Sequence, residues 1–117
     1  MASSNPTGKL VAGFDTAGEA ITDRPGRRVT LLTDTEELAL TAFEYGPGER
    51  GASPHVHSDH SDAFLVLEGE LEITVGFEVF TLHAGEALGF DSATPHLLSN
   101  RTDAPARGIW FVRHPHA

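Results

Sequence analysis

The 117-residue sequence contains no cysteine, and this absence excludes several kinds of site at once. Without thiols the chain has no disulfide framework, no thiolate nucleophile, no cysteine-ligated zinc site and no iron–sulfur cluster. Any metal ion bound by this protein would therefore have nitrogen and oxygen ligands.

Basic residues are also scarce. Eight lysines and arginines stand against seventeen aspartates and glutamates, which gives a formal net charge of −9. Only Arg24, Arg27 and Arg28 lie close together in the sequence. A nucleic acid would meet net repulsion rather than a basic track, so we expect no nucleic-acid partner.

Long hydrophobic runs are absent as well. No apolar segment approaches the roughly 20 residues that a helix needs to span a bilayer. The first ten residues lack the charged start and the apolar core of a secretory signal. We therefore expect a cytoplasmic protein with no membrane partner.

The length of the chain suits one ordinary domain and leaves no room for a second independent core. Residues 1–8 are small and polar, which predicts a flexible N-terminal arm. Residues 9–113 are expected to form the domain, and residues 114–117 a polar C-terminal tail.

Short apolar runs separated by turn residues fill most of the sequence, and they predict eight to ten strands of an all-β sandwich or barrel. Residues 70–75 show the clearest strand pattern, because apolar and polar side chains alternate there. Gly69, between two glutamates, predicts a tight turn just before them. One alternative concerns residues 33–42, where an acidic start allows a single helical turn, too short to change the fold class. The predicted strands cover residues 28–33, 38–45, 63–67, 71–75, 77–82, 87–90, 96–99 and 108–112.

The histidines are the residues that point most directly to chemistry. His55 and His57 are two positions apart, so on a strand their side chains project from the same face. Asp62 follows five residues later, and His96 lies on a later strand. Brought together, three imidazoles and a carboxylate would form a cage for a divalent metal ion.

Two segments resemble the characteristic motifs of the cupin superfamily. Residues 51–69 (GASPHVHSDHSDAFLVLEG) resemble the first motif, with two histidines one residue apart, then a carboxylate and a glycine seven positions beyond it. Residues 85–100 (GEALGFDSATPHLLSN) resemble the second motif, in which an asparagine follows the histidine by four positions. The resemblance runs from about residue 29 to residue 112.

The resemblance implies a single-domain jelly roll, also described as a double-stranded β-helix, with the metal site inside the barrel. It implies that His55, His57, Asp62 and His96 bind a divalent ion, which imidazole and carboxylate chemistry leaves open among iron, zinc, nickel and manganese. It also implies a homodimer, because small single-domain cupins often form one.

Asp62 departs from the resemblance, because the motif usually carries glutamate at this position. The shorter side chain leaves several roles open: fourth metal ligand, partner of the metal through water, acceptor that orients a ligand histidine, or catalytic base. His60 is an alternative fourth ligand. Phe64 and Leu98 share the alternation parity of the ligands and are predicted to line a substrate pocket.

These observations predict a metal-dependent cupin enzyme acting on a small organic molecule. Dioxygenase chemistry would use a redox-active iron, whereas isomerase, cyclase or lyase chemistry would use the metal as a Lewis acid. The alternative is a non-enzymatic cupin module that binds a small ligand or a metal. Asp91 either lines the mouth of the barrel or caps a turn, and the sequence assigns no role to Trp110.

Overall fold

A computed structural model describes residues 19–51, 61–91 and 93–113, and these residues form nine β-strands and no helix. Consequently none of the described segments is a helix that could cross a membrane. The strands are β1 (Glu19–Arg24), β2 (Arg27–Asp34), β3 (Leu38–Tyr45), β4 (Ser61–Glu68), β5 (Glu70–Val75), β6 (Glu78–His83), β7 (Ala87–Asp91), β8 (His96–Ser99) and β9 (Ala106–Arg113).

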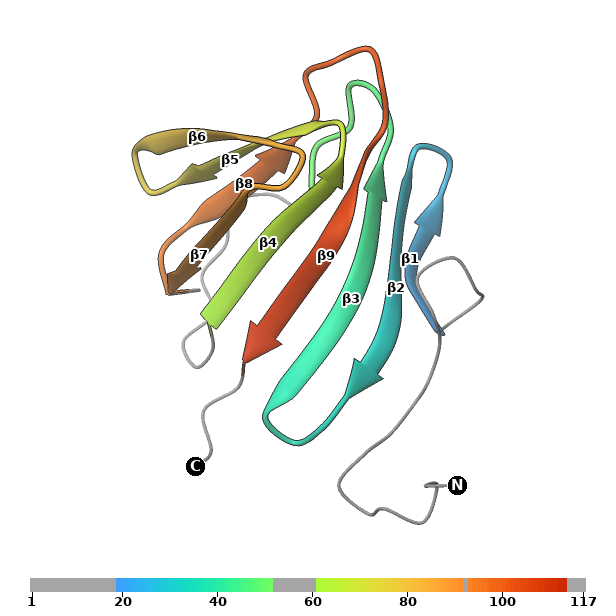
Figure 1. Cartoon of the computed structure of the whole chain (residues 1–117), viewed down its shortest axis with the longest axis vertical. Coiled ribbons are helices and arrows are strands. Elements are labelled where there is room, and N and C mark those ends of the chain that lie inside the picture. Colours follow the sequence, from blue (N-terminus) through green and yellow to red (C-terminus); the bar gives the residue numbers. More distant parts are fainter. Residues whose placement is uncertain (1–18, 52–60, 92, 114–117) are drawn as a thin grey trace.

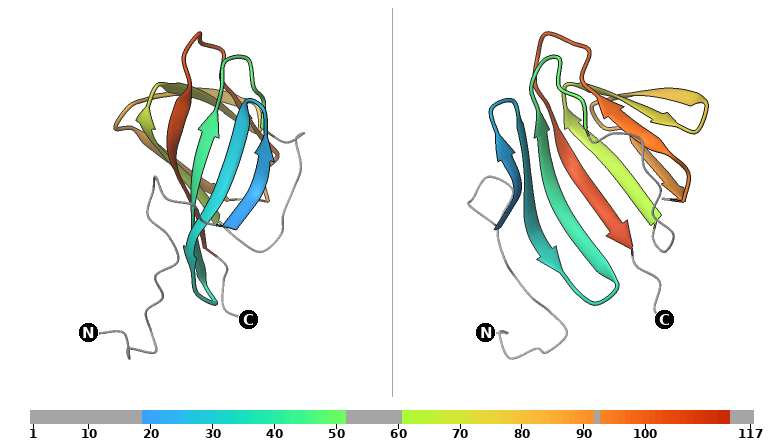
Figure 2. Two further views of the ribbon diagram at one scale, coloured as in Figure 1. Left: turned by 90° about the vertical axis from the view of Figure 1, so that its right-hand side faces the viewer. Right: turned by 180° about the vertical axis from the view of Figure 1, so that it is seen from behind.

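The strands form two antiparallel sheets. One has six strands in the order β1-β2-β3-β9-β4-β7, and the other has three in the order β6-β5-β8. Figure 1 shows the larger sheet as a broad curved layer with the smaller sheet beside β4 and β7, and Figure 2 shows both layers from two further sides. The predicted all-β jelly-roll fold is confirmed.

The hydrophobic core lies between the two sheets. Val66 of β4 and Leu71 and Ile73 of β5 are completely buried, and Phe43 of β3 is 2% exposed. The alternation predicted for residues 70–75 is confirmed, because Glu72 points outward and pairs with Arg101 at 2.7 Å. One face of β5 therefore belongs to the core and the other to the surface.

β4 lies between β9 and β7 in the larger sheet. β9 pairs with β4 from Arg107 to Arg113, with Asp62 opposite Val112 and Phe64 opposite Trp110. On the other side of β4, Asp62 lies opposite Phe90 of β7. Residues of β7 and β9 thus flank the first residues of β4 on its two sides.

Two details differ from the sequence prediction. β1 was not predicted, because among the described strands it pairs only with β2 and its sequence, EAITDR, has few apolar residues. The alternative of a helical turn within residues 33–42 is wrong. The Thr35 N–H donates to the Leu38 carbonyl at 2.7 Å and closes the β2–β3 hairpin, after which β3 pairs on both sides and satisfies its backbone groups.

The predicted domain boundaries at residues 8/9 and 113/114 involve residues outside the described part, so they stay predictions. The predicted turn around Gly69 is present, and Gly69 has φ +81°. An added Cβ there would also meet the Pro105 carbonyl oxygen. Both facts explain why this tight turn between β4 and β5 contains glycine.

Candidate metal site

Asp62 is held at the start of β4 by a side chain from β9. Its carboxylate is buried, with the residue only 3% exposed. The Trp110 indole N–H donates a hydrogen bond to Oδ1 of Asp62 at 3.0 Å. A buried carboxylate without donors would be strongly disfavoured, so this bond contributes directly to keeping Asp62 inside the barrel.

His96 is the first residue of β8 and is 7% exposed. Its Nδ1 lies 2.9 Å from the Thr94 carbonyl oxygen. Since a carbonyl only accepts, Nδ1 carries the proton of this bond, and a neutral ring then has its lone pair on Nε2. That Nε2 atom lies 3.9 Å from Oδ2 of Asp62.

The two facing atoms form one side of a candidate cation site. Imidazole nitrogen and carboxylate oxygen are both common ligands of divalent metal ions. Bonds from a divalent ion to imidazole nitrogen and carboxylate oxygen are each about 2.0–2.2 Å. The observed separation of 3.9 Å is therefore within reach of one shared ion.

Aromatic rings surround this pair. The Phe64 ring lies parallel to Trp110, with centroids 5.7 Å apart and an interplanar angle of 5°. Phe64 also stacks on Phe90 at 6.1 Å, and Phe90 contacts the His96 imidazole at 4.8 Å. These rings exclude water from one side of the pair, which strengthens electrostatic interactions there.

The remaining predicted ligands, His55 and His57, and the alternative ligand His60 lie outside the described residues. Within the described ranges no group of three or more metal-binding side chains gathers. The structure thus brings together two of the four predicted ligands, Asp62 and His96. The complete ligand set stays a prediction.

Phe64 and Leu98, the predicted pocket residues, are both buried core residues with 4% and 6% exposure. Their contact with a substrate stays a prediction. A surface depression of about 330 Å³ lies beside Asp62, at the start of β4 and the ends of β7 and β9. Its lining combines Asp62 and Phe90 with residues of the outer sheet face: Ser61, Ala63, Gly89, Phe111 and Arg113.

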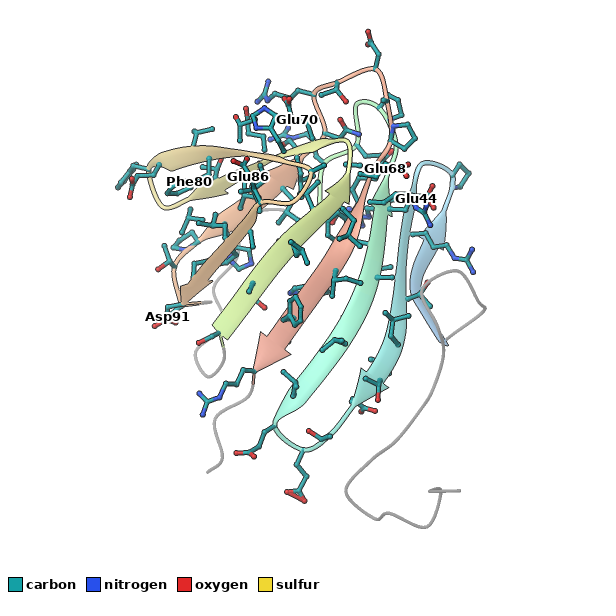
Figure 3. The ribbon with its side chains drawn as sticks, in the orientation of Figure 1. Glu44, Glu68, Glu70, Phe80, Glu86 and Asp91 are labelled. Atoms are coloured by element: carbon teal, nitrogen blue, oxygen red, sulfur yellow. The ribbon has the colours of Figure 1, made fainter. Side chains whose placement is uncertain are left out.

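Asp91 caps a turn, which is one of the two roles predicted for it from the sequence. Its Oδ1 accepts a hydrogen bond from the Ala93 N–H at 2.9 Å, and its carbonyl accepts one from the Thr94 N–H at 3.0 Å. Figure 3 shows Asp91 at the end of β7. This turn leads directly into Thr94, whose carbonyl orients His96.

His83 is a surface histidine with a structural role. Its side chain is 63% exposed, and its ring nitrogens lie 3.2 Å from Glu70 and 3.1 Å from Glu86. Hydrogen bonds from the backbone N–H and then the ring of His83 hold the pKa of Glu86 below its ordinary value. Figure 3 shows both glutamates in the region of the smaller sheet, on the surface of the molecule.

Trp110 is the functional candidate that the sequence did not reveal. Trp110 lies two positions from Gly108 and from Val112 on β9, and both of these residues are buried. Alternation along a strand therefore gives Trp110 an inward side chain, but it does not tell which strand lies beside β9. The pairing with β4 supplied that information.

Comparisons with known proteins agree with this architecture. Residues 41–112 match the family described as Cupin domain. A germin-like protein of Arabidopsis thaliana, subfamily 2 member 2, is 32% identical over 96 residues, which cover 78% of this chain and 43% of that protein. Quercetin 2,3-dioxygenase of Bacillus subtilis is 33% identical over 84 residues, which cover 66% of this chain and 25% of that enzyme.

The chain thus spans less than half the length of these two curated relatives. Among solved structures, KdgF from Halomonas sp. superposes with a TM-score of 0.78 and 19% identity, covering 93% of this chain and 96% of the other. This likeness supports the fold. The family match extends over most of the described strands, and it shows that the chain belongs to the cupin family.

Proposed function

We propose that this protein is a metal-dependent cupin enzyme that acts on a small organic molecule. The observation that carries the proposal is the buried Asp62–His96 pair, with Oδ2 and Nε2 facing each other at 3.9 Å. His55 and His57 would complete the ligand set. A bound iron would supply dioxygenase chemistry, and zinc, nickel or manganese would supply Lewis-acid chemistry for an isomerase, cyclase or lyase.

The described residues have defined tasks in this proposal. His96 would offer Nε2, because Thr94 holds the opposite nitrogen and fixes the ring. Asp62 would offer Oδ2 as a ligand or as a proton acceptor. Phe64 and Phe90 would exclude water from the side of the site where Phe90 contacts the His96 ring. The name of the Bacillus subtilis relative, quercetin 2,3-dioxygenase, supports oxygenation of an organic substrate as the first reaction class to test.

Elemental analysis of untagged protein, purified without a nickel column, tests the metal site. We expect close to one divalent ion per chain in the wild type and a loss of affinity of at least about 100-fold in His96→Ala, because a ligand is removed. The matched control is His83→Ala, which removes an exposed histidine bonded to two glutamates and should keep the metal.

The outcome also separates the two function classes. Metal-dependent oxygen uptake or product formation across a panel of enols, diols and hydroxy-carbonyl compounds would support the enzyme. Stoichiometric metal with no turnover would support the non-enzymatic binding module instead. A wild type that takes up no metal, with His96→Ala unchanged in melting temperature, would contradict the metal-dependent enzyme and the metal-binding module, and would favour a module that binds a small ligand without metal.

We also propose a homodimer formed through the outer face of the larger sheet. Trp110 and Gly108 point into the core, so Ile109 and Phe111 must point outward. Ile109 lies between Ala42 and Leu65, and Phe111 lies between Leu40 and Ala63. A sheet with apolar residues on both faces is typical of a sheet that is covered on both sides.

A charged row beside this apolar surface fits a second copy of the chain. Arg28, Glu44, Arg107 and Glu68 lie opposite one another on β2, β3, β9 and β4, so their charges alternate across the sheet. Figure 3 shows Glu44 and Glu68 at the same end of the sheet. A twofold axis parallel to the strands, between β3 and β9, would bring each arginine opposite a glutamate.

Size-exclusion chromatography with light scattering, which measures the molar mass of the eluted protein, tests this interface. The wild type should have the mass of a dimer, and Ile109→Lys should have the mass of a monomer, because a charge enters the apolar centre of the surface. Val79→Lys on β6 is the control, since Val79 is 59% exposed and lies on the other sheet. A monomeric wild type, or equal behaviour of the two variants, would contradict the proposal.

A further inference from the structure

Trp110 is the single tryptophan of the chain, and the only polar atom of its side chain donates a hydrogen bond to Asp62. Indole N–H groups usually find a partner when they are buried, and most partners are neutral carbonyls or water. Here the acceptor is a carboxylate that is itself 97% buried, since the residue is 3% exposed. The bond therefore joins a partly buried donor to a carboxylate in the interior of the domain.

The indole ring is itself held in place. It lies flat against Phe64 with an interplanar angle of 5°, and Phe64 is 4% exposed between Trp110, Phe43 and Phe90. Because β9 pairs with β4 in a fixed register, the N–H can reach Asp62 from one direction only. The donor is thus a rigid part of the scaffold.

This rigid donor selects between the two carboxylate oxygens. The terminal torsion of an aspartate is broad, so packing alone specifies its carboxylate orientation poorly. With Oδ1 bonded to Trp110, Oδ2 is the oxygen that lies 3.9 Å from Nε2 of His96. Thr94 holds the imidazole in the same way, through its opposite nitrogen.

We propose that Trp110 is a positioning residue of the site, whose N–H fixes the Asp62 carboxylate with Oδ2 directed toward His96. The inference rests on the proposed function, in which Asp62 and His96 belong to a divalent metal site. It explains how a side chain one methylene shorter than glutamate acquires a defined orientation there.

Titration of metal-free protein with Co²⁺, followed by its visible absorption, tests this role. Trp110→Phe keeps an aromatic ring beside Phe64 but removes the donor, and it should weaken Co²⁺ affinity by about 10- to 100-fold and alter the absorption bands. In an Asp62→Ala background, Trp110→Phe should cause no further loss, because Trp110 acts through that carboxylate. Asp62→Leu, which also offers no acceptor, serves as the background if Asp62→Ala does not fold.

Thr30→Val is the matched control. It also removes one polar atom from a buried residue, but Thr30 lies on β2, which is a neighbour of neither β9 nor β4 in the sheet. Its Co²⁺ affinity should equal that of the wild type. Equal affinity losses in Thr30→Val and Trp110→Phe, or an undiminished effect of Trp110→Phe in the Asp62→Ala background, would overturn the inference.

A readout without metal separates this inference from the proposed function. The chain has one tryptophan, so its nitrogen-15 NMR spectrum contains a single indole signal. Asp62→Ala or Asp62→Leu should shift that signal in the metal-free protein, because neither side chain accepts the indole N–H, whereas His83→Ala should not. If the wild type binds no Co²⁺, the proposed metal site fails. In that case a displaced indole signal still supports the positioning of Asp62 by Trp110, and an unmoved signal overturns it.

Discussion

Replacing Gly108 with alanine is expected to destabilise the protein by about 3 kcal/mol, because the new methyl group has no space. Gly108 lies on β9 between Phe43 and Val66 of the neighbouring strands. An added Cβ would meet the Leu65 carbonyl oxygen and would approach two ring atoms of Phe43 at 2.6 and 2.8 Å. Chemical denaturation followed by circular dichroism measures the loss.

Neither neighbour of Gly108 can move easily. The Leu65 oxygen belongs to the backbone of β4, which is paired with β9. Phe43 is 2% exposed and packs edge-on against Tyr45 and Phe64, with centroids 5.8 and 5.9 Å away. Relief of the clash would therefore displace the aromatic core that also supports Trp110.

Gly89→Ala is the control for this prediction. Gly89 is also a strand glycine, but a Cβ there would make ordinary contacts at 3.6 Å to the Asp62 carbonyl and 3.7 Å to Ala63. Its free energy of unfolding should change by less than about 1 kcal/mol, with a gain as the expected direction. A loss at Gly89 as large as the loss at Gly108 would show that strand propensity, rather than the clash, dominates.

The fold was largely predictable because its signals are local. Alternation along β5 and the turn at Gly69 both come from neighbours in the sequence, and the structure agrees with them. β1 was missed because a strand with one paired side needs no apolar pattern, and its sequence has few apolar residues. The helical alternative at residues 33–42 failed because pairing of β3 on both sides outweighs the local preference of an acidic segment.

The site was only partly predictable, because its decisive contacts join distant strands. The motifs identified Asp62 and His96, but the separation of their facing atoms depends on how β4 and β8 lie across the barrel. Trp110 is 48 positions from Asp62, and its role depends on the β9–β4 register, which includes an irregularity between Val66 and Glu68. Such a register follows from packing of the whole domain rather than from any local pattern.

Asn100 was noticed in the sequence only for its spacing from His96, and the structure gives it a large structural role. It is 1% exposed and satisfies all its polar atoms. Its amide nitrogen donates to the carbonyls of Tyr45 and Ala104, each at 2.8 Å. Its side-chain oxygen accepts from the N–H and the hydroxyl of Thr102, at 2.9 and 2.8 Å.

The backbone of Asn100 adds a further connection. Its N–H donates to the Glu49 carbonyl at 2.8 Å, and its carbonyl accepts from the Gly48 N–H at 2.9 Å. Asn100 therefore joins the ends of β3 and β8 to the segment that leads toward His55 and His57. A change here should affect the whole end of the barrel rather than one loop.

Asn100→Asp is expected to destabilise the protein at neutral pH by about 3 kcal/mol or more, because a carboxylate oxygen would face the Tyr45 and Ala104 carbonyls in place of the amide donor. The loss should shrink in acid, since burial raises the pKa of the introduced carboxyl and its protonated form can donate again. Thr102→Val provides the comparison: it removes one hydroxyl, keeps the amide bonds, and should cost about 1 kcal/mol at every pH. Denaturant titrations of both variants at neutral and acidic pH test this. A pH-independent loss in Asn100→Asp would mean that shape, rather than the two donated hydrogen bonds, makes Asn100 necessary at this junction.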